Sequence, residues 1–180
     1  IPGIALSKQN PHAFIQVING LTGKTHYIEY PLSAFSSGRK EFWVKVGASV
    51  FTRESVYVDI DSDGLKITGR LLYTGNVKYP STWYSPGIMG WYSFVPFMEC
   101  KHAVVSVSHR IDGMLDINGT SIDFSGGKGY IEKDWGKSFP ESWIWLQSNH
   151  FSHPDACIML SIARIPWLGS FFVGFLGFLY

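Results

Sequence analysis

Apolar and polar residues alternate along most of this chain, in short runs rich in β-branched and aromatic side chains. Such runs are typical of β-strands, and no stretch keeps an apolar period of 3.6 residues for three turns. Turn-forming pairs separate the runs at Asn19-Gly20, Asp63-Gly64, Asp112-Gly113, Asn118-Gly119 and Gly126-Gly127. Strands are predicted over 12–18, 25–30, 41–46, 55–60, 65–73, 102–109, 114–117, 120–124, 129–133 and 142–151. Ten or more strands joined by hairpins predict an all-β fold, an antiparallel barrel or sandwich.

Two segments depart from this pattern. Residues 75–96 combine three prolines with Ser, Gly and aromatic residues, which predicts a long loop or lid. The C-terminal run offers only fourteen residues from Trp167, fewer than the roughly 20 of a membrane-spanning helix, and it is interrupted by Pro166, Gly169, Gly174 and Gly177. We therefore expect a buried β-hairpin, formed with the preceding strand at 156–164 across a Pro-Trp-Leu-Gly turn.

Composition narrows the class of protein. Apolar residues make up 46% and charged residues 16% of the 180 residues, which is enough apolar material for the core of one domain. We expect residues 1–180 to form a single β-domain region of a longer protein, incomplete at both ends, because the chain starts at Ile1 and stops within an apolar run. The net charge is +1 and the charges are scattered, so no nucleic-acid partner is expected.

The sequence contains parts of metal-binding motifs, but none of these motifs is complete. Residues 59–64 match the opening of a calcium loop, but Arg70 stands where a bidentate Glu is required. The spacing of His102 and His109 places them on opposite faces of a strand, and so does the spacing of His150 and His153. The two cysteines form no C-x-x-C motif. We expect no metal site.

Acidic and large aromatic residues are concentrated in GYIEKDWGKSFPESWIWLQSNHF, residues 129–151. In a strand over 129–134, Tyr130, Glu132 and Asp134 share one face. In the next strand, one face carries Trp143, Trp145, Gln147 and Asn149. Gly136 and Pro140 can turn the chain between the two strands, so we expect them to pair as a hairpin.

Two hypotheses fit this segment. An apolar cavity would raise the pKa of a carboxyl group and leave a neutral acid, while aromatic faces would stabilise a cation formed by protonating an alkene. Acid-initiated cyclisation or hydration of an isoprenoid uses both effects. Alternatively, Glu132 and Lys133 are solvated edge residues and the tryptophans only fill a core.

The run KGYIEKDWGKSFPESWIWLQSNHF resembles the signature of the tocopherol cyclase family, E-K-[ND]-W-G followed by F-P-x-x-W-x-W-x-Q-x-N-x-F. Residues 86–109 are also similar to bacterial members of that family. The resemblance implies a lipocalin-like β architecture, related to carotenoid hydratases. It also implies closure of a chromanol ring, in which an acid protonates a prenyl double bond and a ring hydroxyl captures the cation. No redox cofactor or metal is implied.

The resemblance also suggests site residues. Glu132 and Asp134 are the candidate acids, and Glu132 is favoured because Asp134 stands where plant members carry Asn. Candidate substrate contacts are Tyr130, Trp135, Trp143, Trp145, Gln147 and Asn149, with Trp91 and Phe94 from the loop. The family's N-terminal G-W-Y-F-K strand and its C-terminal strands are not in this sequence, which agrees with a fragment.

These observations predict a tocopherol cyclase-like protein that acts, without a cofactor, on a hydrophobic small molecule such as a prenylated quinol or isoprenoid. We expect the protein to lie in the cytoplasm or at the periphery of a membrane. One alternative is a non-catalytic lipid carrier with the same fold. Another is a carbohydrate-binding β-sandwich, because aromatic platforms and Asp-Gly turns also suit glycans.

Overall fold

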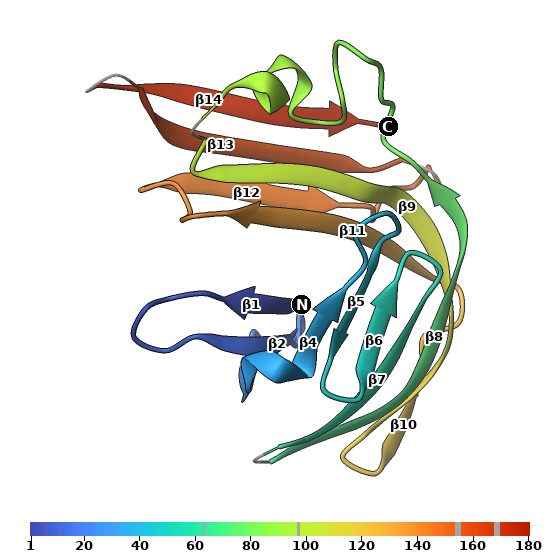
Figure 1. Cartoon of the computed structure of the whole chain (residues 1–180). Helices are drawn as coiled ribbons and strands as arrows, with labels where there is room; N and C mark the ends of the chain where they lie inside the picture. The colour runs from blue at the N-terminus through green and yellow to red at the C-terminus, as the bar shows by residue number, and fades with distance from the viewer. Residues whose placement is uncertain (63, 97, 154–155, 168–169) are drawn as a thin grey trace. The chain divides into compact units, whose positions relative to one another are not determined.

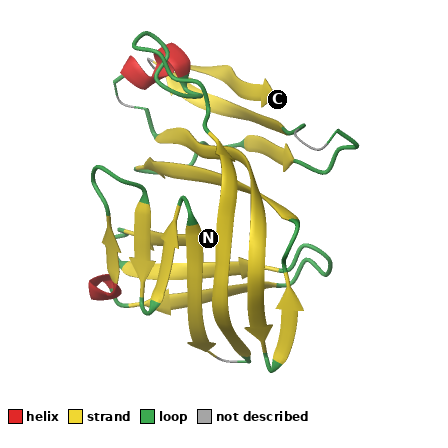
Figure 2. Cartoon of the chain, turned by 90° about the vertical axis from the view of Figure 1, so that its right-hand side faces the viewer, coloured by secondary structure: helices red, strands yellow, loops and turns green. Residues whose placement is uncertain are grey.

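The computed structural model describes residues 1–62, 64–96, 98–153, 156–167 and 170–180. Within these ranges nearly all regular structure is strand, no α-helix occurs, and two 3-10 turns are present, η1 (Leu32–Ala34) and η2 (Gly90–Phe94) (Figure 2). Every strand pair with a defined register is antiparallel. The all-β antiparallel class predicted from the sequence is therefore confirmed.

The chain folds into two compact units. Unit 1 contains Ile1–Thr74 and Ile111–Gly127, and unit 2 contains Gly75–Arg110 and Lys128–Tyr180. The organisation of residues 1–180 as one lipocalin-like region stays a prediction.

Unit 1 contains most of the short strands (Figure 1). One sheet has the order β1-β2-β3, with bounds Pro2–Ala5, His12–Ile18 and Thr25–Tyr30. The other has the order β10-β9-β8-β7-β6-β5-β4, and its strands β8 and β9 continue from unit 1 into unit 2. Its bounds, from β4 to β10, are Phe35–Ser37, Trp43–Val46, Ser49–Thr52, Ser55–Ser62, Leu65–Val77, Cys100–Ile117 and Thr120–Asp123. Alternation along β7 buries Val56, Val58 and Ile60, which join the unit's apolar core.

Glycines decide where strands turn in unit 1. Asn118-Gly119 forms the predicted tight turn, with φ of 54° and 80°. The prediction of a turn at Asp112-Gly113 is wrong, because β9 runs straight through it and joins the two strands expected there. A Cβ on Gly113 would collide with the carbonyl oxygen of Arg70, so this glycine permits a close approach of backbones. Asp63, in another predicted turn, lies outside the described residues.

Unit 2 contains β11 (Gly127–Gly136), β12 (Trp143–Ser148), β13 (Ile158–Trp167) and β14 (Ser170–Leu179). The last three form a sheet in the order β12-β13-β14, whereas β11 pairs with β9. The predicted hairpin between 129–134 and 142–149 is therefore wrong. Gly136 lies against the backbone of Glu99 and Cys100, and Lys137 N donates to Glu99 O at 2.8 Å, so the end of β11 is bonded to the start of β9 instead.

The C-terminal hairpin is confirmed, with β13 and β14 in register from Ile158↔Leu179 to Trp167↔Ser170. Leu168 and Gly169, in its predicted turn, lie outside the described residues. Burial is restricted to one face: Met159 and Ser161 are buried, whereas Phe171 and Val173 are exposed. No helix in the described ranges is long and apolar enough to cross a membrane.

Candidate functional site

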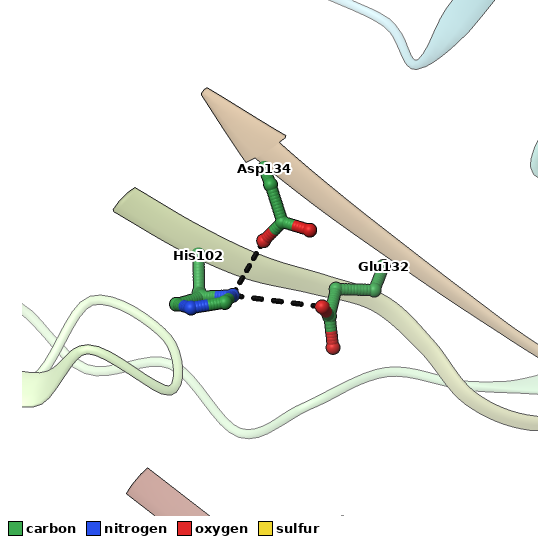
Figure 3. A group of neighbouring side chains, drawn as sticks. All are labelled: His102, Glu132 and Asp134. Carbon is green, nitrogen blue, oxygen red and sulfur yellow. Dashed lines mark ion pairs between the residues drawn. The ribbon is translucent and has the colours of Figure 1, made fainter. Parts of the chain in front are cut away.

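An ion cluster in unit 2 joins β9 to β11 (Figure 3). His102 comes from β9, while Glu132 and Asp134 lie two positions apart on β11 and so share a face, as predicted. His102 Nδ1 lies 3.5 Å from Glu132 Oε1 and in close contact with Asp134 Oδ1. The side chains of His102 and Glu132 are only 17% and 12% exposed, so water screens this ion pair weakly.

Two neighbours fix Glu132 from its other side. Tyr130 donates its hydroxyl to Glu132 Oε2 at 2.5 Å, and the indole Nε1 of Trp145 donates to the same oxygen at 3.3 Å. Trp145 comes from β12, so β11 and β12 meet through side chains although they share no backbone ladder. The predicted proximity of acid and aromatic faces is therefore present without the predicted hairpin.

The cluster favours a protonated histidine. Burial alone would lower the pKa of His102, but its contacts with Asp134 and Glu132 outweigh burial and raise that pKa to about 9. The imidazole thus carries a positive charge at neutral pH. It faces two carboxyl groups, and their pKa values shift in opposite directions.

Burial alone would raise the pKa of Glu132, but contacts with His102, Tyr130 and Trp145 hold it below its ordinary value. Burial raises the pKa of Asp134, and the negative charge of Glu132 adds to that rise despite the opposing effect of His102. The sequence-based argument placed Glu132 in an apolar cavity, whereas the structure places it against His102, Tyr130 and Trp145, which favour its ionised form; its role as an acid stays a prediction. Asp134 is the carboxyl group that more readily holds a proton.

An apolar cleft in unit 2 adjoins the cluster and encloses about 520 Å³, part of it open to solvent. His102 lines it, whereas Glu132 and Asp134 do not, so the imidazole is the group of the cluster that borders the cleft. Burial, then the charges of Asp134 and Glu132, raise the pKa of the lining thiol Cys100 to about 11, which keeps it neutral. The other lining residues are Met89, Tyr92, Met98, Glu99, Pro140, Ser161, Ala163, Ile165, Pro166, Gly174 and Leu176.

Other predicted contacts lie elsewhere in unit 2. Trp135 is 46% exposed beneath the Lys133 ammonium, and Trp143 is 53% exposed and stacked on Phe139. Asn149 is buried and donates to Gly129 O at 3.3 Å, which ties the end of β12 to β11. Gln147 has a buried amide nitrogen without a hydrogen-bond partner among the described residues.

The predicted loop at 75–96 begins after β8 ends at Val77, and the substrate contacts predicted in it stay a prediction. Trp91 and Phe94 are exposed and are not part of the cleft lining, whereas Met89 and Tyr92 are. Trp91 stacks on Tyr92 with ring centroids 4.1 Å apart. Sequence reasoning missed His102 as a partner of the acids, because the two strands that carry them are far apart in the chain. The alternation within β9 predicts which face of the strand carries His102, but it does not predict which strand lies beside that face.

The three donor atoms of His102, Glu132 and Asp134 lie within 4.8 Å of one another. A divalent cation accepts such a set of imidazole and carboxylate ligands. The protonated imidazole already supplies a positive charge between the carboxylates, so the geometry does not require a metal ion. The sequence-based expectation of no cofactor and no metal stays a prediction.

Fold and site together define an antiparallel β protein with an apolar cleft beside a half-buried ion cluster. The family model described as "Tocopherol cyclase-like" matches residues 72–164, more than half of the chain, and the chain belongs to this family. The resemblance seen in the sequence is therefore confirmed. All three residues of the ion cluster lie within the matched range.

Two curated relatives are similar to part of the chain. They are the "Probable tocopherol cyclase, chloroplastic" of Oryza sativa subsp. japonica and the "Tocopherol cyclase, chloroplastic" of Zea mays. Each is 31% identical over 74 residues, which is 41% of this chain. The chain spans only 16% of the length of these relatives. No solved structure matches the chain significantly.

Proposed function

We propose that this protein binds a prenylated quinol, or a related isoprenoid, in the cleft of unit 2 and closes a ring by acid-initiated cyclisation. The observation that carries the proposal is the position of His102, which lines an apolar cleft and is ion-paired to two carboxylates. The family and the names of the two plant relatives support this chemistry for the longer protein.

The proposed reaction needs one proton and returns it. A proton from the cluster adds to the less substituted carbon of the prenyl double bond, and a tertiary carbocation forms at the other carbon. The ring hydroxyl oxygen attacks this cation and forms the C–O bond, and the hydroxyl proton then passes back to the cluster. Substrate and product are isomers, so no oxidant, reductant or cofactor is consumed.

The cluster residues take different roles in this proposal. Asp134, whose pKa is raised, holds the exchangeable proton, and His102, which lines the cleft and contacts Asp134, relays that proton between Asp134 and the substrate. Glu132 remains ionised and balances the imidazolium charge, with Tyr130 and Trp145 fixing its position. The faces of Tyr92 and Trp145 are suited to stabilise the cation.

The test is single-turnover conversion of a prenylated hydroquinone, with the ring-closed isomer separated by its retention. Asp134→Asn, Glu132→Gln and His102→Gln should each lower the rate about a hundredfold, the usual scale for losing a positioned acid or its partner. Glu141→Gln is the matched control, because Glu141 pairs with Arg164 on the surface of the same unit. Its rate should equal that of the wild type. Wild-type rates in all three cluster variants would refute the proposed roles.

A carrier function is the second candidate, and one observation favours it. The carboxyl group most enclosed by the cluster, Glu132, is held in its ionised form, which is not a proton donor. A carrier would bind the prenylated hydroquinone and return it unchanged. Binding by the wild type without conversion would therefore decide for the carrier.

A further inference from the structure

Ser161 is a buried polar residue in the wall of an otherwise mostly apolar cleft. It is 5% exposed and lies on β13. Its hydroxyl makes no hydrogen bond to any other residue that the structure describes, and its oxygen is not among the fully enclosed polar atoms of these residues, so it is reached from the cleft. By contrast, the buried hydroxyl of Ser106 contacts Ser108 O at 3.1 Å and His109 Nδ1 at 2.9 Å. The oxygen of Ser161 is therefore available to a hydrogen bond from a ligand that enters the cleft.

Ser161 also lies close to the ion cluster. It is directly opposite Trp145 in the β12–β13 ladder, and the indole of Trp145 donates to Glu132. Cross-strand neighbours on one face have Cβ atoms about 5 Å apart. A ligand oxygen held by Ser161 would therefore lie near the same acids that His102 contacts.

Small residues open the cleft beyond Ser161. Ala163 follows it on the same face of β13 and is paired with the buried Gly174 of β14. Ile165 comes next on that face, and the span from Ser161 to Ile165 is about 13 Å at the usual rise of a strand. Ser161, Ala163 and Ile165 form the floor of the cleft. The floor has a small side chain, Ala163, at its centre, and this suits an extended hydrocarbon chain.

We infer that Ser161 is the specificity-determining anchor of the cleft: its hydroxyl binds a ring hydroxyl of the ligand, and the ligand's prenyl tail runs along β13 over Ala163 toward Ile165. The inference rests on the proposed ligand class and assigns the orientation of that ligand. It places the reacting ring at the end of the cleft next to Trp145 and the ion cluster. Ser161 acts by binding and takes no proton from the alkene.

The test compares two ligands by equilibrium binding: a prenylated hydroquinone and the matching prenylated benzene, which lacks both hydroxyls. Ser161→Ala should weaken binding of the hydroquinone about fivefold, the scale of one hydrogen bond, and leave binding of the hydrocarbon unchanged. Ser142→Ala, at an exposed serine of the same unit, should change neither. Ala163→Leu should weaken binding of both ligands, because its side chain would fill the centre of the floor.

Three outcomes would overturn the inference. Equal effects of Ser161→Ala on both ligands would show a packing role rather than recognition of oxygen. Unchanged hydroquinone binding in Ser161→Ala, with normal conversion by the wild type, would refute the anchor and leave the proposed function standing. If the wild type bound neither ligand, both the inference and the proposed function would fail. A matching unfolding midpoint for Ser161→Ala and the wild type confirms that the variant is folded.

Discussion

Replacing His102 by Gln should remove a pH-dependent part of the stability of unit 2. The folded-state pKa of His102 is about 9, above the ordinary value of 6.5, because Asp134 and Glu132 outweigh the effect of burial. Folding therefore favours the protonated imidazole. Its stabilisation is fully present below about pH 6.5 and is lost as the pH rises through about 9.

The size of the effect follows from the shift. Each pKa unit corresponds to about 1.4 kcal/mol, so the raised pKa of His102 represents at most about 3.5 kcal/mol of folding free energy. The side chain is only 17% exposed, so solvent screening reduces this figure little. His102→Gln should therefore be less stable than the wild type by about 2 to 3 kcal/mol near pH 6, and the difference should shrink toward pH 10.

Urea unfolding of both proteins at several pH values from about 6 to 10 measures this difference. His150→Gln is the matched control, because His150 is an exposed histidine of the same unit. Its stability should follow that of the wild type across the whole range. An NMR titration of the wild-type imidazole resonances gives the folded-state pKa independently.

Two results would refute the reasoning. One is a gap between wild type and His102→Gln that stays constant with pH, because the charge of the imidazole would then contribute nothing. The other is titration of His102 near its ordinary value, which would mean that the carboxylates do not hold the proton on the imidazole in solution.

Two further predictions concern backbone packing and metal ions. Gly136→Ala should destabilise the protein by more than about 2 kcal/mol in urea unfolding, because a Cβ there would collide with the backbone of Glu99 and Cys100. Gly20→Ala is the control, because the space around Gly20 is open, and equal effects of the two substitutions would contradict the β9–β11 contact. Treatment with EDTA should leave single-turnover conversion unchanged, because the imidazolium of His102 already supplies the positive charge between the carboxylates. If EDTA abolished turnover and added Zn²⁺ restored it, the three groups would instead bind a metal.

The sequence by itself determined most of the strands and their faces, although it missed the short strands β1, β4 and β6. Alternation is a local property with a period of two, so it correctly placed Tyr130, Glu132 and Asp134 on one face of β11. Turn chemistry is local as well, and it located the turn at Asn118-Gly119. The family signature depends on residues close together in the chain, so it too could be read without a structure.

Only the tertiary structure decided which strands are neighbours. The choice of β9 over β12 as the partner of β11 depends on backbone contacts between residues more than thirty positions apart, which no local pattern encodes. That pairing brings His102 to Glu132 and Asp134 and reverses the expected protonation of Glu132. The pairing of β9 with β8 explains why Asp112-Gly113 is not a turn, because Gly113 lies against the backbone of Arg70 in β8 and a glycine with positive φ serves a tight turn and a close backbone approach equally well. The charge of a side chain depends on all groups around it, so the state of this site follows from the packing of the strands and not from the sequence of any one of them.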